Sequence, residues 1–220
     1  MTPFQSERKA PMGVRHIEIN GMKLAILESD DVYDSVTGRP LTGSWLWDSA
    51  LVLSRWMASH GQAEFSLQGK TVLELGAGLG LPGLTAALLG ARRVLLTDVG
   101  SLLPGLERNV EANGLGDRVE VQELVWGSDE SMGRLGEFGD FDVVLMSDVF
   151  FDAAEMAALA KTLRWACGRE TRCWAASEVR EWTWVCLNEL VTEGFRLTEL
   201  PSLSGQDVFA VYHIFPPSIS

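Results

Sequence analysis

The sequence predicts an α/β fold: one domain built on a mostly parallel seven-strand sheet, with an antiparallel C-terminal edge pair, helices on both faces and an N-terminal β-hairpin extension. Its 220 residues, 46% of them hydrophobic and 22% charged, suit one domain with a substantial core. From Lys70 onward, short β-rich runs alternate with helical segments, and strands separated by helices form a parallel sheet covered on both sides. Before Lys70, two apolar runs meet at Asn20-Gly21, a dipeptide typical of a tight hairpin turn.

The first expected elements are a tail and the hairpin. Residues 1–13 are polar and irregular, so we expect a flexible tail there. Asn and Gly both accept the positive φ values of a two-residue turn. The Asn20-Gly21 turn therefore predicts strands over 14–19 and 22–28.

A loop and a helix follow the hairpin. The loop over 30–43 is rich in Asp, Gly and Pro, and apolar residues over 45–61 recur at helical spacing. After the tail we expect a single domain, in which 14–42 form the hairpin and loop and 43–220 form a ligand-binding core. Because the hairpin and the loop precede this core, we expect both to flank the channel through which a second substrate enters.

The remaining elements alternate along the core. Seven β-rich runs predict strands over 71–76, 92–99, 118–124, 141–150, 171–179, 196–200 and 208–215. Four runs with helical spacing predict helices over 82–90, 101–114, 153–168 and 180–194. The last two strands are close enough in sequence to form the antiparallel edge pair.

The charge balance argues against nucleic acid as a partner. Thirty acidic and 18 basic residues give a net charge of -12, and the basic residues are scattered rather than gathered in a stripe. Between Glu123 and Glu155 there are nine acids and one base, Arg134. The N-terminus lacks an apolar signal core, and no apolar stretch reaches the roughly 18 to 20 residues of a membrane span. We therefore expect a protein that binds neither nucleic acid nor membrane.

Cysteines and histidines exclude two kinds of site. The sequence contains three of each: Cys167, Cys173, Cys186, His16, His60 and His213. The cysteines are odd in number and lack CxxC spacing, so we expect no metal and a reducing compartment, the cytoplasm with the nucleus as a second location. No histidine lies in a catalytic motif, which disfavours a His-dependent hydrolase; surface or packing positions are expected instead.

A glycine-rich turn follows the strand over 71–76. Glu74 precedes Gly76, Gly78 and Gly80 at alternate positions, and Pro82 suits the first turn of the next helix. Glycines allow a sharp turn against which a ligand packs. With Gly83 they also satisfy the dinucleotide pattern G-x-G-x-x-G. However, the turn begins with a carboxylate and contains no Lys or Arg between Thr71 and Ala91, so a cationic or zwitterionic ligand fits better than a pyrophosphate.

Two further residues follow strand ends. Asp98 ends the next strand, where an acid accepts hydrogen bonds from ribose hydroxyls in dinucleotide sites; the alternative is an N-cap for the following helix. Trp126 follows the strand after that, where its indole either stacks on adenine or covers the sheet edge.

The segment FDVVLMSDVFFD predicts a fourth strand that delivers Ser147 and Asp148 to the same sheet edge. Ligands of open α/β sheets bind at the carboxyl ends of the strands. We therefore expect the reacting groups to face Asp148, Phe150 and Phe151.

With these motifs in place, the sequence resembles Rossmann-like seven-strand methyltransferases, whose S-adenosylmethionine (SAM) sites share the pattern of an acid followed by alternating glycines. From about Gly43 to the C-terminus it resembles the protein-lysine methyltransferases grouped as methyltransferase family 16. The segments GSWLWDSALVLSRWM, LERNVEANG, ELVWG and SDVFFD resemble family segments in the right order. The acid-x-x-aromatic signature falls on Asp148 and Phe151. Many members have Tyr in the last place, so Phe151 keeps the aromatic wall without a hydroxyl.

The resemblance implies an enzyme that transfers methyl from SAM to a lysine side chain of a protein, with S-adenosylhomocysteine (SAH) as product. We also expect a monomer. It implies these cofactor-binding residues: Trp47, Glu74, Gly76, Gly78, Gly80, Asp98, Trp126 and Ser147. It also implies that Asp148 and Phe151 place the target lysine. Core packing is a compatible role for Trp47.

Three other functions remain open. The same SAM pocket also suits methylation of a small molecule. A scaffold that binds SAM without catalysis is the second alternative, and an NAD-binding oxidoreductase is the third.

Overall fold

The computed structural model describes residues 13–29, 32–33, 38, 40–201 and 208–217. The expected tail therefore lies outside the described residues, except for Gly13, which begins the first strand. Much of the loop over 30–43 also lies outside them.

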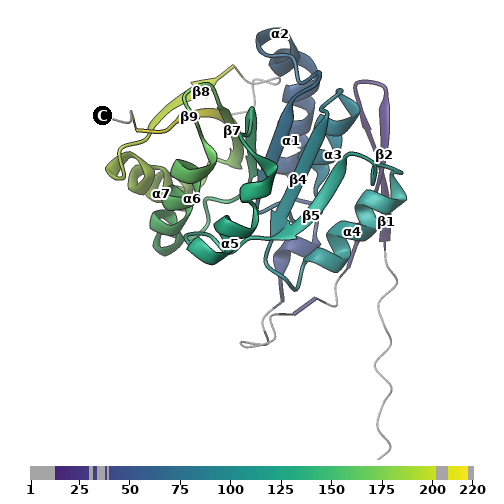
Figure 1. Ribbon diagram of the computed structural model, residues 1–220, viewed down its shortest axis with the longest axis horizontal. Helices are drawn as coiled ribbons and strands as arrows, with labels where there is room; N and C mark the ends of the chain where they lie inside the picture. The colour runs from purple at the N-terminus through teal and green to yellow at the C-terminus, as the bar shows by residue number, and fades with distance from the viewer. Residues whose placement is uncertain (1–12, 30–31, 34–37, 39, 202–207, 218–220) are drawn as a thin grey trace, which may run out of the picture.

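The core is a seven-strand sheet in the order β5-β4-β3-β6-β7-β9-β8 (Figure 1). Its strands are β3 (Thr71–Leu75), β4 (Arg93–Asp98), β5 (Val119–Glu123), β6 (Val143–Ser147), β7 (Arg172–Glu178), β8 (Arg196–Leu200) and β9 (Phe209–Phe215). The first five are parallel, whereas β9 runs antiparallel to both β7 and β8. This confirms the predicted sheet and its antiparallel edge.

Helices lie between the strands, as the sequence predicts. They are α1 (Asp48–Trp56), α2 (Gln62–Glu64), α3 (Leu81–Leu88), α4 (Leu103–Ala112), α5 (Asp129–Arg134), α6 (Met156–Ala166) and α7 (Glu181–Thr192). A π-helical turn, η2 (Met57–Gly61), continues α1 to the predicted end. The described residues also form three 3₁₀ turns: η1 (Thr42–Ser44), η3 (Gly136–Phe138) and η4 (Ala153–Glu155).

Two hydrophobic layers enclose the sheet because its strands alternate their side chains between the faces. In β3, Val72 packs into the layer built by α1, α3, α4 and β2. Its neighbours Leu73 and Leu75 pack into the layer built by α5, α6 and α7. Glu74 therefore points to the same face as Val72, toward α3.

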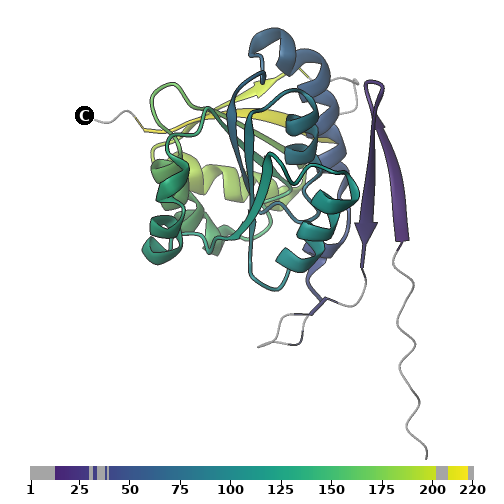
Figure 2. The same ribbon diagram turned by 45° about the vertical axis from the view of Figure 1, so that its right-hand side comes forward.

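The N-terminal hairpin packs on α4 (Figure 2). Its strands β1 (Gly13–Ile19) and β2 (Met22–Glu28) meet at Asn20 and Gly21, whose φ values are 48° and 84°. Asn113, at the C-terminal cap of α4, accepts from Ala25 N at 2.9 Å and donates to Ala25 O at 2.8 Å, as a neighbouring strand would. The predicted hairpin is confirmed.

The strand order places a ligand edge at the centre of the sheet. From β3 the chain runs outward to β5 and then returns to β6 on the other side of β3. Ligands of open α/β folds bind at the carboxyl ends of strands flanking such a reversal. The residues that follow β3, β4 and β6 meet there.

Candidate functional site

The glycine turn after β3 forms the floor of the site. Gly76, Gly78 and Gly80 all have positive φ values, between 54° and 79°. A Cβ on Gly78 would lie 2.9 Å from the carbonyl oxygen of Gly43. Any other residue at Gly78 would therefore be strained and would push away the segment that precedes α1.

Asp98 closes the turn from the end of β4. Its Oδ2 accepts from Gly78 N and its Oδ1 from Val99 N, both at 2.7 Å. Burial raises the pKa of Asp98, against the two backbone hydrogen bonds. The alternative role as an N-cap is wrong, because α4 begins at Leu103 and its N-cap is Leu102.

Glu74 lies behind the turn rather than in the wall of a cavity. Its side chain is fully buried, and its Oε2 accepts from Gly83 N at 2.8 Å. Oε1 has no hydrogen-bond partner among the described residues. Burial raises the pKa of Glu74 from 4.5 to about 8, and the charge of Asp98 adds to the rise, while the bond from Gly83 opposes it. A cofactor-binding role for Glu74 stays a prediction.

Two cavities adjoin at this edge. The Trp47 cavity, of about 260 Å³, is lined by Trp45, Trp47, Gly78, Gly80, Leu102, Ser147, Asp148 and their neighbours. The Trp126 cavity, of about 330 Å³, is lined by Leu124, Val125, Trp126, Asp152 and Glu155. Both cavities share four residues, which are Gly76, Asp98, Val99 and Phe151. Together they form one cleft along the carboxyl edge of the sheet.

Trp47 and Trp126 stand at opposite ends of this cleft. The indole of Trp47 donates to Thr42 O at 3.0 Å and is 36% exposed. Trp126 is partly buried against the core, and a Cβ on Gly76 would lie 3.2 Å from its ring. Each tryptophan thus contacts a segment beside the glycine turn and offers ring surface to its cavity.

Asp148 is held in an unusual backbone conformation after β6. Its φ of 56° is left-handed, which is uncommon outside Gly, Asn and Asp. Its Oδ1 accepts from Ser49 Oγ at 3.2 Å and from Ser177 Oγ at 3.5 Å. Elements far apart in the sequence, α1 and β7, thereby fix one carboxylate oxygen at the cavity wall.

The two phenylalanines after Asp148 diverge. Phe151 is 64% exposed and lines both cavities. Phe150 is buried among core residues and lines neither cavity. The expectation that Phe150 faces the reacting groups is therefore wrong, because its side chain completes the layer beneath α6 and α7.

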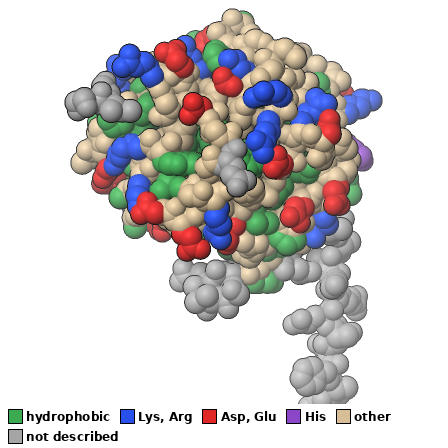
Figure 3. Space-filling model, in the orientation of Figure 1, with side chains coloured by type: hydrophobic (Ala, Val, Ile, Leu, Met, Phe, Trp, Pro, Cys, Tyr) green, Lys and Arg blue, Asp and Glu red, His purple; other side chains and the backbone are tan. Residues whose placement is uncertain are grey.

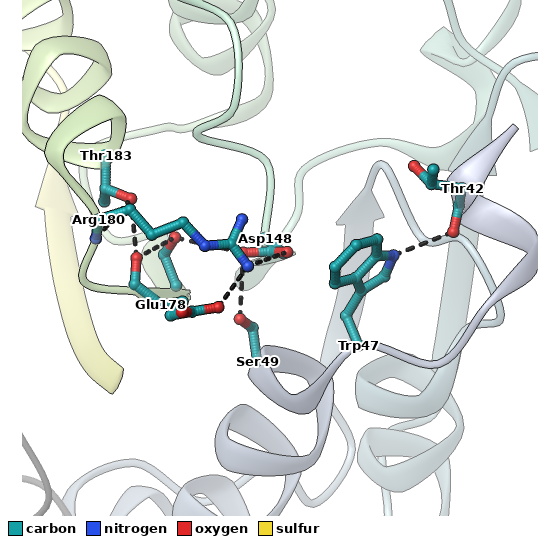
Figure 4. A network of polar contacts seen from close by, with 8 residues as sticks. Thr42, Trp47, Ser49, Asp148, Glu178, Arg180 and Thr183 are labelled. Carbon is teal, nitrogen blue, oxygen red and sulfur yellow. Dashed lines mark hydrogen bonds and ion pairs between the residues drawn. The ribbon is translucent and has the colours of Figure 1, made fainter. Parts of the chain in front are cut away.

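Arg180 adds a cation that no sequence motif indicated (Figure 4). Its Nη2 pairs closely with Glu178 and lies 4.0 Å from Asp148 Oδ2, and its guanidinium lies 5.9 Å from the Trp47 ring centroid. Sequence reasoning missed Ser49, Ser177 and Arg180. The available signal was positional: Ser177 and Arg180 flank the carboxyl end of a strand beside β6.

The hairpin does not line the cleft. Leu41 and Gly43 of the loop line the Trp47 cavity, whereas β1 and β2 line neither cavity. Leu27 and Glu28 of β2 line a smaller hollow beside Gly78 and Leu79. That the hairpin and the loop flank the acceptor channel stays a prediction.

Histidine and cysteine side chains stay outside the cleft. His16 and His60 are exposed, and His213 packs on Phe215 at 3.9 Å between ring centroids. All three cysteines are free and buried. In the part of the chain that is described, no three His, Cys, Asp or Glu side chains cluster as metal ligands, and no helix there is long and apolar enough to cross a membrane.

A family model described as lysine methyltransferase matches residues 27–184. Among curated proteins, the N-terminal and lysine N-methyltransferase EFM7 of Cryptococcus neoformans is 36% identical over 135 residues, covering 58% of this chain and 44% of that protein. Protein N-lysine methyltransferase METTL21A of Mus musculus is 38% identical over 139 residues, covering 61% and 60%. The match thus spans about half the length of these relatives.

Solved structures show the same fold at low sequence identity. A SAM-dependent methyltransferase from Agrobacterium tumefaciens aligns with 99% of this chain and 74% of its own, with a TM-score of 0.59 and 15% identity. A ribosomal protein L11 methylase from Lactobacillus delbrueckii subsp. bulgaricus aligns with 79% and 81%, with a TM-score of 0.57 and 17% identity.

Proposed function

We infer that this chain, which belongs to the lysine methyltransferase family, transfers a methyl group from SAM to the side-chain amine of a lysine in a protein. One observation carries the inference beyond family membership. The charged residues that line the two adjoining cavities are all acidic: Asp98, Asp148, Asp152 and Glu155. An acidic cleft favours a sulfonium cofactor and an amine acceptor, and it disfavours a pyrophosphate.

The turn and its neighbours fit SAM. Gly76 and Gly78 line the Trp47 cavity without a side chain, so their backbone can approach a ligand closely. Asp98 offers carboxylate oxygens to the ribose hydroxyls, and Trp126 offers a ring face to adenine. Trp47, Gly80 and Ser147 line the neighbouring cavity, where the methionine part would lie.

Positioning is the main contribution of the protein to such a transfer. When bound, SAM supplies an activated methyl group: the amine lone pair forms the N–C bond while the C–S electron pair returns to sulfur, giving SAH. Asp148, fixed by Ser49 and Ser177, accepts a hydrogen bond from the amine. Phe151 lines both cavities and presents an apolar ring to the acceptor side chain, where the face of the ring also attracts a cation.

The test uses radiolabelled SAM with a cell extract that lacks the enzyme. Wild type should label lysine residues of discrete proteins, identified by mass spectrometry. Asp148→Ala and Phe151→Ala should each lower the initial rate by about 100-fold, because they remove the groups that place the amine. Asp117→Ala, on the exposed surface, is the matched control. Wild-type activity in both site variants would overturn the assignment.

The other functions predict different outcomes. Label confined to the size-filtered fraction would indicate a small-molecule acceptor. SAM binding without any methylated product would favour a scaffold. Tighter binding of NAD than of SAM by calorimetry would indicate an oxidoreductase, which the all-acidic cleft disfavours.

We propose a monomer that acts in the cytoplasm and also in the nucleus, without nucleic acid or membrane as partner. The three free cysteines support a reducing compartment. On the face shown in Figure 3, basic side chains lie interspersed with acidic ones rather than in one patch, and the net charge is -12, which disfavours a polyanion.

A further inference from the structure

Arg180 lies between β7 and α7, next to two residues that line the Trp47 cavity. Its guanidinium pairs closely with Glu178 and faces two residues of the cavity wall, Asp148 and Trp47 (Figure 4). The 4.0 Å between Nη2 and Asp148 Oδ2 is too long for a hydrogen bond. Oδ2 therefore feels the positive charge but keeps its capacity to accept a hydrogen bond from another group.

Local structure fixes this cation in place. Thr183 N donates to Arg180 O at 3.1 Å, Arg180 N donates to Thr183 Oγ1 at 3.4 Å, and Thr183 Oγ1 donates to Glu178 O at 2.7 Å. The side-chain bond to Glu178, with the charges of Asp148 and Glu178, raises the pKa of Arg180. The guanidinium is thus a permanent charge on a rigid turn.

A positive charge beside the carboxylate favours the reactive form of an amine acceptor. A lysine amine attacks only as the neutral base, but a carboxylate beside it favours the protonated form. The charged groups facing this position from the surrounding elements are Asp148 after β6, Glu178 of β7, Arg180 before α7 and Asp98 across the cavity. Helix α1 contributes Ser49, a neutral residue that donates to Asp148. Its first turn also contains Asp48, which is exposed. Without Arg180, all the charges on this side would be negative.

We propose that Arg180 is a positioning residue of the acceptor site, which acts through Asp148 so that the carboxylate receives the lysine as a neutral amine. The proton leaves to solvent before methyl transfer. Glu178 holds the guanidinium near enough to Asp148 for its positive charge to offset that of the carboxylate. The guanidinium stays too far away to occupy Asp148 Oδ2. This proposal rests on the proposed function and adds how the site selects the reactive form of its substrate.

The test compares pH profiles of kcat, using as acceptor the purified protein identified by the labelling experiment. In Arg180→Gln the loss of the positive charge should move the acidic limb of the kcat profile to higher pH by about one unit. As a result, kcat near pH 7 should fall about tenfold. At about pH 11, above the ordinary lysine pKa of about 10.4, the amine is largely neutral, and the rate should return to within about twofold of wild type. KM for the acceptor should stay equal or fall, because the protonated lysine binds the unneutralised carboxylate.

Two further variants separate charge from structure. Arg180→Lys keeps the cation and should restore most of the wild-type profile. Arg164→Gln removes an arginine of the same exposed fraction, 41%, that pairs with Glu193 far from the cleft, so it should leave the profile unchanged. A rate lowered equally at every pH, or a profile not restored by Lys, would overturn the proposal while leaving the proposed function intact. If wild type labels no protein lysine, the proposed function fails and this proposal fails with it.

Discussion

The carboxyl group of Glu74 lies in the interior with one hydrogen bond, from Gly83 N, and its pKa is raised from 4.5 to about 8. Between these two pH values the folded protein holds a proton on Glu74 that the unfolded chain has released. The unfolded state thus binds fewer protons, so the free energy of unfolding falls as pH rises. We predict a contribution of about -1.4 kcal/mol per pH unit across this window.

Glu74→Gln removes this contribution while keeping an oxygen that accepts from Gly83 N. The variant should show a shallower fall in the free energy of unfolding between pH 5 and about 8, measured by urea denaturation at several pH values. Exposed Glu111→Gln on α4 serves as control and should keep the wild-type slope. Equal slopes in wild type and Glu74→Gln would show that Glu74 does not carry the buried proton.

At this scale the sequence could predict residues that belong to one local motif. Gly76 and Gly78 follow the end of β3, and Asp98 is the last residue of β4; their positions in the cleft follow from the parallel sheet alone. The environment of Asp148 could not be predicted in this way, because Ser49 and Ser177 come from distant elements. Only the packing of α1 against the sheet brings Ser49 to that carboxylate.

Among the elements, α4 joins the hairpin to the ligand edge through two asparagines one helical turn apart. Among the described residues, the side chain of Asn113 hydrogen-bonds to Ala25 of the hairpin and to Asn109 O of α4. Asn109 accepts from Leu27 N at 2.8 Å and also donates to Leu79 O of the glycine turn at 3.1 Å. The two side chains therefore form a matched pair for separating hairpin docking from cofactor binding.

Asn113→Ala and Asn109→Ala should each lower the free energy of unfolding by about 1–3 kcal/mol, because each leaves backbone groups of β2 without partners. Only Asn109→Ala should also weaken SAM binding, by several-fold in calorimetry, since it frees the carbonyl of the turn. Loss of SAM affinity in Asn113→Ala at a temperature where it stays folded would show instead that the hairpin itself supports the cofactor.

The regular elements could be predicted because their apolar periodicity is strong, as in β3 and α6. The short helix α5 could not: its 6 residues, Asp129–Arg134, lie in an acidic stretch without apolar spacing, and it begins where Ser128 Oγ accepts from Ser131 N at 3.2 Å. The π-helical turn at Met57–Gly61 could not be predicted either, because it keeps the apolar pattern of the helix before it.

For the molecule as a whole, the net charge of -12 matters because acidic side chains gather at the cleft. Acidic side chains supply all the charged lining of the cleft, with Asp152 and Glu155 exposed at its Trp126 end. Arg180 pairs closely with Glu178 and lines neither cavity. A basic segment of an acceptor protein would therefore meet a negative field at the entrance, which raises its association rate.

This field predicts how acceptor binding responds to salt and to neutral substitutions. Raising NaCl from about 50 mM to about 300 mM should raise KM for the acceptor roughly fivefold by screening, while kcat changes little. Asp152→Asn with Glu155→Gln should raise KM at low salt and flatten the salt dependence. Glu107→Gln with Glu170→Gln removes two exposed acids that line neither cavity and makes the same change in net charge. This control should keep the wild-type salt dependence of KM. If both double variants behave alike, total charge rather than the acidic entrance governs the encounter, since only the placement of the charges differs between them.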